Sequence, residues 1–237
     1  MNPRIVEVRK NIMKKNDLAA AALRDRFQLK RMFVASFVSS PGAGKTAFLE
    51  RTLKVARSSR RVAALVGDLA TEQDAERLRH SGAPVRQITT GTVCHLDAEM
   101  IEHALQDWPP DEVDWLFIEN VGNLVCPASY DLGEQLRAVL LSVTEGEDKP
   151  LKYPTIFNTA DVAIITKTDL AAAVEFDRQA LVENIARVRP GLEVLEVSAK
   201  TGDGFDRWMA LLDRRAAAAT TTARVPADRA LASPLAP

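Results

Sequence analysis

Short apolar runs alternate with segments of helical periodicity from position 32 onward, and this alternation predicts the fold. The apolar runs expected to form strands occupy residues 32–38, 61–66, 85–88, 113–118, 138–143, 162–165 and 193–197. Segments with helical spacing lie at residues 47–57, 72–79, 96–106, 176–188 and 205–212. Nearly continuous apolar strands alternating with helices are typical of an α/β fold, a mostly parallel sheet with helices on both faces.

The two ends of the chain depart from this pattern. Residues 1–31 carry apolar positions at roughly helical spacing and an excess of basic residues, which predicts one or two amphipathic helices. This extension is either a solvated helix surface or a docking surface for a partner. Residues 214–237 are rich in Ala, Thr and Pro, so we expect a disordered tail, with an Ala-rich terminal helix as the alternative. The predicted central domain spans residues 32–213.

Residues 39–46 read Ser-Ser-Pro-Gly-Ala-Gly-Lys-Thr, between the first predicted strand and helix of this domain. A phosphate-binding loop (P-loop) needs glycines for close backbone approach, a lysine for the β- and γ-phosphates and a hydroxyl for Mg²⁺. Lys45 and Thr46 supply the last two. Ser39 stands where the usual pattern has Gly, and a chance Gly-Lys-Thr is the alternative. The residues expected to contact nucleotide here are Pro41, Gly42, Ala43, Gly44, Lys45, Thr46 and Ala47.

Two acidic residues follow predicted strands and are candidates for the magnesium site. Asp68 follows the strand at 61–66, and Glu119 follows the strand at 113–118. The carboxyl ends of parallel strands share one edge of the sheet, where the phosphates would also lie. We therefore expect Thr46, Asp68 and Glu119 to hold Mg²⁺, and Lys45 to join them in catalysing nucleotide hydrolysis. A surface carboxylate at a strand end is the alternative for either acid.

Two further segments predict that the base is guanine. Residues 166–169 read Thr-Lys-Thr-Asp, close to the Asn-Lys-x-Asp segment with which GTPases bind guanine. Asp169 would accept hydrogen bonds from the guanine N1 and exocyclic amine, a donor pair that adenine lacks, and the Lys167 stem would cover the ring. Thr166 replaces the usual Asn. The loop whose backbone N–H meets the guanine O6 is matched by Ser198, Ala199 and Lys200.

Two thiols and an imidazole are expected near the same sheet edge. Cys94 and His95 are adjacent, just before the predicted helix at 96–106, and Cys126 follows the strand at 113–118. Such ligands suit a soft or borderline divalent metal such as Zn²⁺ or Ni²⁺. Three ligands are one short of a closed tetrahedral site, so water or a second subunit would complete it. Two buried cysteines and an incidental histidine are the alternative. His80 and His103 are expected on helix surfaces.

Bulk composition narrows the possible partners. The 237 residues carry a net charge of −1, which gives no overall attraction to nucleic acid or to an anionic membrane. No apolar run approaches the roughly 20 residues of a membrane helix, and the first ten residues lack the apolar core of a signal peptide. We therefore expect a cytoplasmic protein with no nucleic-acid and no membrane partner. A disulfide between Cys94 and Cys126 is disfavoured there.

Four stretches of the chain resemble the HypB family, GTPases of the SIMIBI class that assist nickel insertion into [NiFe]-hydrogenase. They are residues 39–46, residues 89–98 (Thr-Thr-Gly-Thr-Val-Cys-His-Leu-Asp-Ala), residues 118–128 (Ile-Glu-Asn-Val-Gly-Asn-Leu-Val-Cys-Pro-Ala) and residues 142–154 (Ser-Val-Thr-Glu-Gly-Glu-Asp-Lys-Pro-Leu-Lys-Tyr-Pro). The resemblance runs from the amino-terminal helices to about residue 212. The sequence alone offers no physical reason for the last of these stretches.

The resemblance implies a P-loop protein that hydrolyses GTP to GDP and phosphate, forms a nucleotide- or metal-dependent homodimer and acts as a metallochaperone in hydrogenase maturation. It implies a nucleotide-responsive site for Ni²⁺ or Zn²⁺ built from Cys94, His95 and Cys126. Cys126 lies seven residues beyond Glu119, so movement at the γ-phosphate could reach the metal ligands. The implied partners are a HypA-type nickel metallochaperone, docked on the amino-terminal helices, and the hydrogenase large-subunit precursor.

Two departures from the family pattern limit the inference. The chain has neither the amino-terminal Cys-x-x-Cys-Gly-Cys site nor the histidine-rich stretch of some members, so we expect neither a tight amino-terminal nickel site nor a storage role. Thr166 in place of Asn is the second departure. Two other functions stay open: a GTPase metallochaperone for another enzyme, such as urease or a cobalamin-dependent enzyme, and a weakly catalytic GTP-dependent interaction module.

Overall fold

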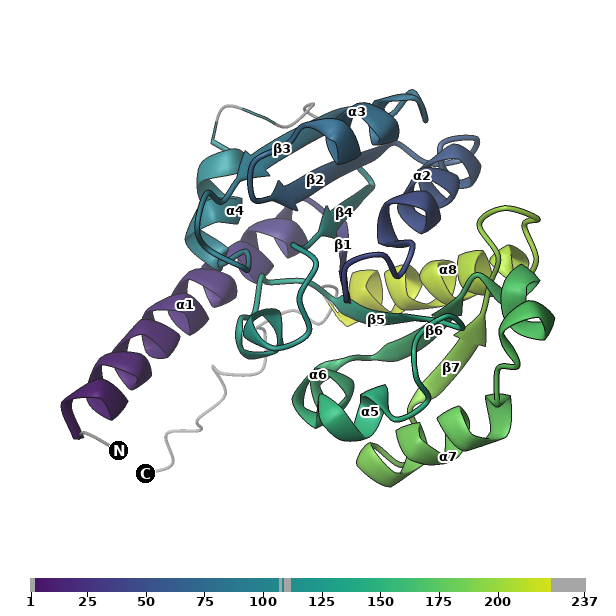
Figure 1. Cartoon of the computed structure of the whole chain (residues 1–237). Helices are drawn as coiled ribbons and strands as arrows, with labels where there is room; N and C mark the ends of the chain where they lie inside the picture. Colours follow the sequence, from purple (N-terminus) through teal and green to yellow (C-terminus); the bar gives the residue numbers. More distant parts are fainter. Residues whose placement is uncertain (1–2, 107, 109–111, 223–237) are drawn as a thin grey trace, which may run out of the picture.

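The computed structural model describes residues 3–106, 108 and 112–222, and within these residues the chain builds one parallel sheet (Figure 1). Its strands, in the order β3-β2-β4-β1-β5-β6-β7, all run parallel. Their bounds are β1 (Phe33–Ser39), β2 (Val62–Asp68), β3 (Val85–Thr89), β4 (Trp115–Glu119), β5 (Leu136–Ser142), β6 (Val162–Thr166) and β7 (Glu193–Glu196). The predicted α/β fold is therefore confirmed.

Helices cover both faces of the sheet because the central strands are apolar on both sides. On one face, Phe37 of β1 packs with Phe48 of α2 (Lys45–Ala56) and Trp208 of α8 (Phe205–Thr222), and α3 (Gln73–Arg79) lies on this face too. On the other face, Val34 packs with α1 (Pro3–Leu29) and α4 (Ala98–Ala104), while Val38 packs with α6 (Pro154–Thr159) and α7 (Arg178–Val188). Figure 1 shows α1 and α4 side by side.

Several helix bounds differ from the predicted ones, and side-chain caps account for two of them. The helix expected from residue 96 begins at Ala98, because Asp97 accepts the Met100 N–H and caps it. The helix expected from residue 176 begins at Arg178, because Asp177 accepts the Ala180 N–H. Four short elements were not expected: the helices α5 (Lys149–Lys152) and α6, and the 3₁₀ helices η1 (Cys126–Ser129) and η2 (Thr168–Val174).

The carboxyl-terminal segment corrects the prediction of a disordered tail from residue 214. The last helix, expected at 205–212, continues as α8 to Thr222, as the alternative of an Ala-rich helix proposed. Alanine has the highest helix propensity, Ala216 and Ala219 pack against the core, and Arg214 donates to the Glu193 carboxylate at 3.0 Å. The remainder of the expected tail, residues 223–237, lies outside the described residues.

The amino-terminal extension is a single continuous helix, α1, rather than two. It packs through buried Ala20, Leu23 and Phe27. Among the described residues, none of the helices is both long and apolar enough to span a membrane.

Candidate nucleotide and metal sites

The phosphate loop joins β1 to α2, as its sequence predicts. Gly42 and Gly44 have φ values of +77° and +86°, a left-handed region that favours glycine. Gly44 is the N-cap residue of α2, so the first N–H groups of that helix open toward the loop. Such a helix start, with its partial positive charge, is a binding site for phosphate oxygens.

Glu119, the last residue of β4, binds the lysine and the threonine of the phosphate loop. Its Oε1 accepts hydrogen bonds from Lys45 Nζ at 2.8 Å and from Thr46 Oγ1 at 2.7 Å. Glu119 is fully buried, and among the described residues its Oε2 has no hydrogen-bond partner. A buried carboxylate oxygen beside a threonine hydroxyl is a donor set that fits Mg²⁺. The structure thus brings three of the four predicted catalytic residues together.

Asp68, the fourth, lies at the expected sheet edge but turns its carboxylate to its own loop. Oδ1 accepts the Leu69 N–H at 2.6 Å, and Oδ2 accepts the Thr71 N–H and hydroxyl at 3.1 and 2.6 Å. The structure therefore does not join Asp68 to the cluster around Glu119. Asp68 would have to release Thr71 before it could serve a metal ion.

The segments expected to bind guanine meet each other and the phosphate loop. Asp169 Oδ1 accepts the Ser198 hydroxyl at 2.6 Å, which brings the two segments together. Lys167 Nζ donates to the Gly42 carbonyl at 2.6 Å. The Thr166 hydroxyl donates to the Ala43 carbonyl, also at 2.6 Å. Thr166, the departure from Asn, therefore ties the base-binding segment to the phosphate loop.

The remaining members of the predicted base loop are held by α2. Arg51 donates to the Ala199 carbonyl at 3.0 Å and to the Lys200 carbonyl at 3.5 Å. Because α2 begins at the phosphate loop, this contact fixes the base loop relative to the expected phosphate site.

Residues 142–154, which had no explanation from sequence, contact the phosphate loop. Glu145 Oε1 accepts the Ser40 hydroxyl at 2.5 Å and pairs with Lys149 at 3.0 Å. Its Oε2 accepts the Ser142 N–H at 2.9 Å. Ser40, Glu145 and Lys149 were absent from the predicted site; the only signal for the last two was their place in a stretch that resembles a family.

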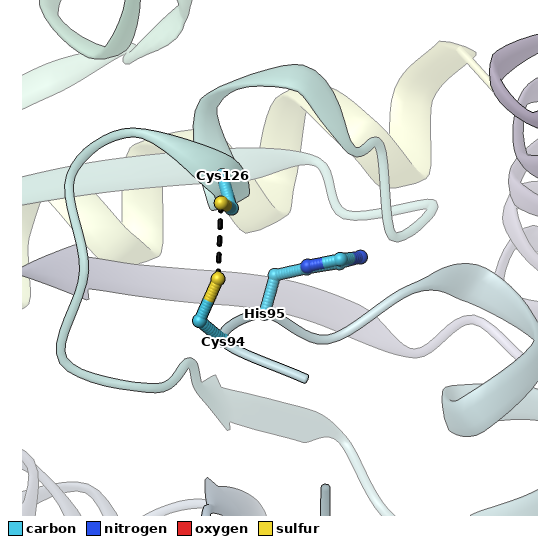
Figure 2. A group of neighbouring side chains, drawn as sticks. All are labelled: Cys94, His95 and Cys126. Atoms are coloured by element: carbon cyan, nitrogen blue, oxygen red, sulfur yellow. Dashed lines mark hydrogen bonds between the residues drawn. The ribbon is translucent and has the colours of Figure 1, made fainter. Parts of the chain in front are cut away.

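Cys94, His95 and Cys126 converge, although they come from two segments (Figure 2). Cys94 and His95 lie in the connection from β3 to α4, and Cys126 opens η1. The two Sγ atoms are 3.0 Å apart, and ligand atoms of all three residues lie within 4.8 Å of one another. The three side chains are half-buried, and two thiols with an imidazole form a donor set for Zn²⁺ or Ni²⁺.

His95 is oriented and kept neutral by its surroundings. Its ring stacks on Tyr130, with centroids 3.9 Å apart and planes at 23°. Burial lowers the pKa of His95 below its usual 6.5, against a smaller opposing effect of the Asp97 charge. The imidazole is therefore neutral at neutral pH, the form that binds metals. Its Nδ1 is buried and has no hydrogen-bond partner among the described residues. His80 and His103 are exposed, as expected.

Two asparagines connect the loop after β4 to the Cys94 segment. Asn120 follows Glu119, is 1% exposed, and accepts the Leu96 N–H at 3.1 Å. Asn123 donates to the Cys94 carbonyl at 3.1 Å. The end of β4 and the loop after it therefore touch Lys45 and Thr46 through Glu119 and the segment of the thiol–imidazole cluster through the two asparagines.

Comparisons with known proteins show to which family the chain is similar. The family model described as CobW/HypB/UreG, nucleotide-binding domain, matches residues 33–196. The hydrogenase maturation factor HypB of Azotobacter vinelandii is 48% identical over 212 residues, covering 90% of this chain and 70% of that protein. The hydrogenase/urease maturation factor HypB of Helicobacter pylori (strain 26695) is 42% identical over 199 residues, covering 82% of this chain and 81% of that protein.

A solved structure has the same fold over most of its length. The crystal structure of HypB from Helicobacter pylori in complex with nickel matches with a TM-score of 0.81 at 41% identity, covering 86% of this chain and 96% of that one. This chain therefore belongs to the HypB family, within the wider CobW/HypB/UreG group of P-loop nucleotide-binding proteins.

Proposed function

We propose that this protein is a GTP-hydrolysing metallochaperone that assists nickel insertion into [NiFe]-hydrogenase during its maturation. The observation that carries the proposal is the continuity from Glu119, which holds Lys45 and Thr46, to Asn120, which holds the segment of His95. The names of the relatives, and the nickel complex of one of them, support the choice of metal and of client enzyme.

For the nucleotide, Lys45 would bind the β- and γ-phosphates, and Thr46 with Glu119 would hold Mg²⁺. Asp68 would complete the magnesium site after its contact with Thr71 opens. Bound Mg²⁺ would supply positive charge to the phosphates, and Lys45 would stabilise the negative charge that develops during phosphoryl transfer. Lys167 and Asp169 support GTP and GDP as the nucleotides, and Asp169 is hydrogen-bonded to Ser198 of the second guanine segment.

For the metal, Cys94, His95 and Cys126 would carry Ni²⁺ as cargo, and Zn²⁺ would compete for the same ligands. A tetrahedral site needs a fourth ligand, which water or a second copy of this chain would supply. This incomplete ligand set supports a homodimer whose formation depends on metal or nucleotide.

The partners proposed are a HypA-type nickel metallochaperone and the hydrogenase large-subunit precursor, all in the cytoplasm. The helix α1 exposes Ile12 and Leu18, at 51% and 66%, which supports docking of the first partner there. Exposed apolar side chains on a helix surface are suited to such contacts.

A single-turnover assay tests the enzymatic half of the proposal. Wild-type protein mixed with limiting GTP and Mg²⁺ should release phosphate slowly, and Lys45→Ala should release it at least about a hundredfold more slowly, the usual effect of losing a preorganised charge. ATP should release less phosphate than GTP. Equal phosphate release by both proteins would leave an interaction module as the better description.

Isothermal titration with Ni²⁺ and Zn²⁺ tests the metal half. Wild type should bind either ion stoichiometrically, and Cys126→Ala should abolish binding at micromolar concentration. The exposed His103 gives a matched control, because His103→Ala removes a metal-binding side chain outside the cluster and should change nothing. Unaltered binding by Cys126→Ala would refute the assigned ligands.

A second client enzyme is favoured by one observation. The Helicobacter pylori relative is named a hydrogenase/urease maturation factor. Urease is therefore the alternative recipient of nickel. Deleting the gene in its host and assaying both enzyme activities, with and without added nickel, separates the two: the proposed function requires loss of hydrogenase activity.

A further inference from the structure

Among the described side chains, one polar residue stands at the amino-terminal end of the buried stripe by which α1 packs on the domain. Buried side chains recur along α1 at positions 16, 20, 23 and 27. Three of them are apolar, namely Ala20, Leu23 and Phe27. The remaining one is Asn16, which is only 5% exposed. A buried amide is unfavourable without hydrogen-bond partners, so its presence in this stripe must be explained by what it binds.

Asn16 uses both ends of its amide, and each end binds one of the two segments that carry the thiol–imidazole cluster. Nδ2 donates to the Asp131 carbonyl at 3.0 Å. Oδ1 accepts the Ala98 N–H at 2.9 Å. Ala98 lies three residues after His95, and Asp131 follows Tyr130, on which the His95 ring stacks.

Other contacts of α1 fix the same corner of the molecule. Arg24 donates to both carboxylate oxygens of Asp131 at 2.7 Å. A Cβ on Gly133 would come within 2.9 Å of the Ala20 carbonyl oxygen, so the loop after η1 lies directly against α1. The helix therefore contacts the Cys126 loop firmly, and Asn16 extends that contact to the segment of Cys94 and His95.

We propose that Asn16 is a positioning residue of the metal site. Its two hydrogen bonds join the two segments and so keep Cys94 and His95 close enough to Cys126 to bind one metal ion together. Asn16 thereby slows release of the ion. The inference rests on the metal site of the proposed function. A preorganised set of ligands binds more tightly than a mobile one, and losing residues that orient metal ligands lowers affinity by roughly ten- to a hundredfold.

The test compares three variants of the full chain loaded with Ni²⁺. Asn16→Ala removes both hydrogen bonds. Asn16→Asp keeps an acceptor for the Ala98 N–H but cannot donate to the Asp131 carbonyl. The matched control is Asn184→Ala, because Asn184 donates to the Glu147 carbonyl at 3.0 Å and so loses an amide hydrogen bond away from the metal ligands.

Three quantities are measured: the rate of nickel transfer to a chelator, the sulfur-to-nickel charge-transfer absorption and the affinity for GDP. Nickel should leave Asn16→Ala about tenfold faster than wild type, at the lower end of the range for residues that orient ligands. Asn16→Asp should show a smaller increase, and Asn184→Ala none. The absorption should change only in the Asn16 variants, and GDP affinity should stay the same in all.

A wild-type rate in folded Asn16→Ala, or an equal acceleration in Asn184→Ala, overturns the inference. Should Asn16→Ala not fold, Asn16→Asp decides it by the same rate. The outcome also separates the two proposals. If wild type binds nickel and the Asn16 variants release it at the wild-type rate, the positioning role alone is refuted. If wild type binds no nickel, the metal site and the positioning role are refuted together.

Discussion

The Glu119 carboxylate holds two side chains that a bound nucleotide would also require. Its Oε1 accepts from both Lys45 and Thr46, and all three residues are buried. A buried ammonium group is costly without an anionic partner, so Glu119 compensates Lys45 before the phosphates arrive. Under the proposed function, nucleotide binding would replace Glu119 by phosphate as the anionic partner of Lys45.

Glu119→Gln should consequently destabilise the nucleotide-free protein more than the nucleotide-bound one. Removing one member of a buried ion pair lowers the free energy of unfolding by about 3 kcal/mol or more. Saturating GDP should restore much of this loss, because phosphate would then pair with Lys45. Urea unfolding of both proteins, with and without GDP, measures the two differences. Identical losses in the two conditions would argue against the exchange of partners.

Thr166 is the second residue whose role a single substitution can test, because valine has the same shape and lacks the hydroxyl. Its hydroxyl donates to the Ala43 carbonyl at 2.6 Å, and the residue is 3% exposed. Thr166→Val leaves that carbonyl without this donor and should cost about 1–2 kcal/mol of stability, together with weaker GDP binding. Thr159→Val is the control, since exposed Thr159 donates only within its own helix and should cost less than about 0.5 kcal/mol. Equal losses in chemical unfolding of the two variants would disprove the special role of Thr166.

Among the elements, the phosphate loop could be predicted residue by residue because its parts are contiguous. Strand, glycine turn, Lys45, Thr46 and helix follow one another in the chain, so local pattern and local chemistry coincide. The parallel strands and the helices on both faces followed from apolar periodicity in the same way, whereas the order of the strands in the sheet was not predicted. Helix bounds were less certain, because caps such as Asp97 act through single hydrogen bonds that periodicity does not report.

The parts that sequence did not predict depend on residues far apart in the chain. Asn16 meets the Asp131 carbonyl across 115 positions, and Ser40 meets Glu145 across 105. No spacing rule says which side chains become neighbours over such separations. The juxtaposition of Cys94 and Cys126 was one of two interpretations of the residues themselves, and the family resemblance favoured it. The stacking of Tyr130 on His95 had no signal in the sequence.

The attachment of α1 should depend on pH through Asp131. Burial acts to raise the pKa of Asp131, but hydrogen bonds from Arg24 and from the Gly133 N–H outweigh it, so the pKa lies below 3.8. A carboxyl group with a lowered pKa in the folded state contributes stability that is present above its unfolded pKa. That contribution is lost as the pH falls through the folded value.

Asp131→Asn should therefore be less stable than wild type at pH 7, by about 1 kcal/mol because water screens this half-exposed pair. The gap should close as the pH is lowered below about 3.8, where wild type also loses its charge. The difference between the two unfolding free energies, measured from pH 7 to pH 3, cancels the titration of other groups. A gap that stays constant over this range would show that the charge of Asp131 does not anchor α1.

On the scale of the molecule, both candidate sites lie at the carboxyl edge of one parallel sheet. The end of β4 and the loop after it serve both, because Glu119 contacts Lys45 and Thr46, while Asn120 and Asn123 contact the segment of Cys94 and His95. Gly122 in this loop lies so near Pro41 that a Cβ would come within 3.2 Å of it. The phosphate loop therefore packs directly against the loop that contacts the Cys94 segment.

This shared loop predicts reciprocal coupling between nucleotide and metal. Whatever factor a GTP analogue applies to nickel affinity, nickel must apply to the affinity for the analogue. We expect a factor of roughly tenfold, within the usual range of about 5- to 150-fold. Asn120→Leu, which removes the acceptor for the Leu96 N–H, should bring both factors toward one while each ligand still binds.

The two factors are obtained from four titrations: nickel into the nucleotide-free and analogue-bound protein, and the analogue into the metal-free and nickel-bound protein. Dimerisation is a third equilibrium that could enter, so the titrations are repeated at two protein concentrations with the molecular mass recorded. If the two affinity factors are equal and do not change with protein concentration, the coupling acts within one chain, through the loop after β4. If they are equal but grow with protein concentration, the coupling acts across a dimer, in which a second copy would supply the missing metal ligand. Factors of one in wild type would make the two sites independent, and the shared loop would then be a matter of packing alone.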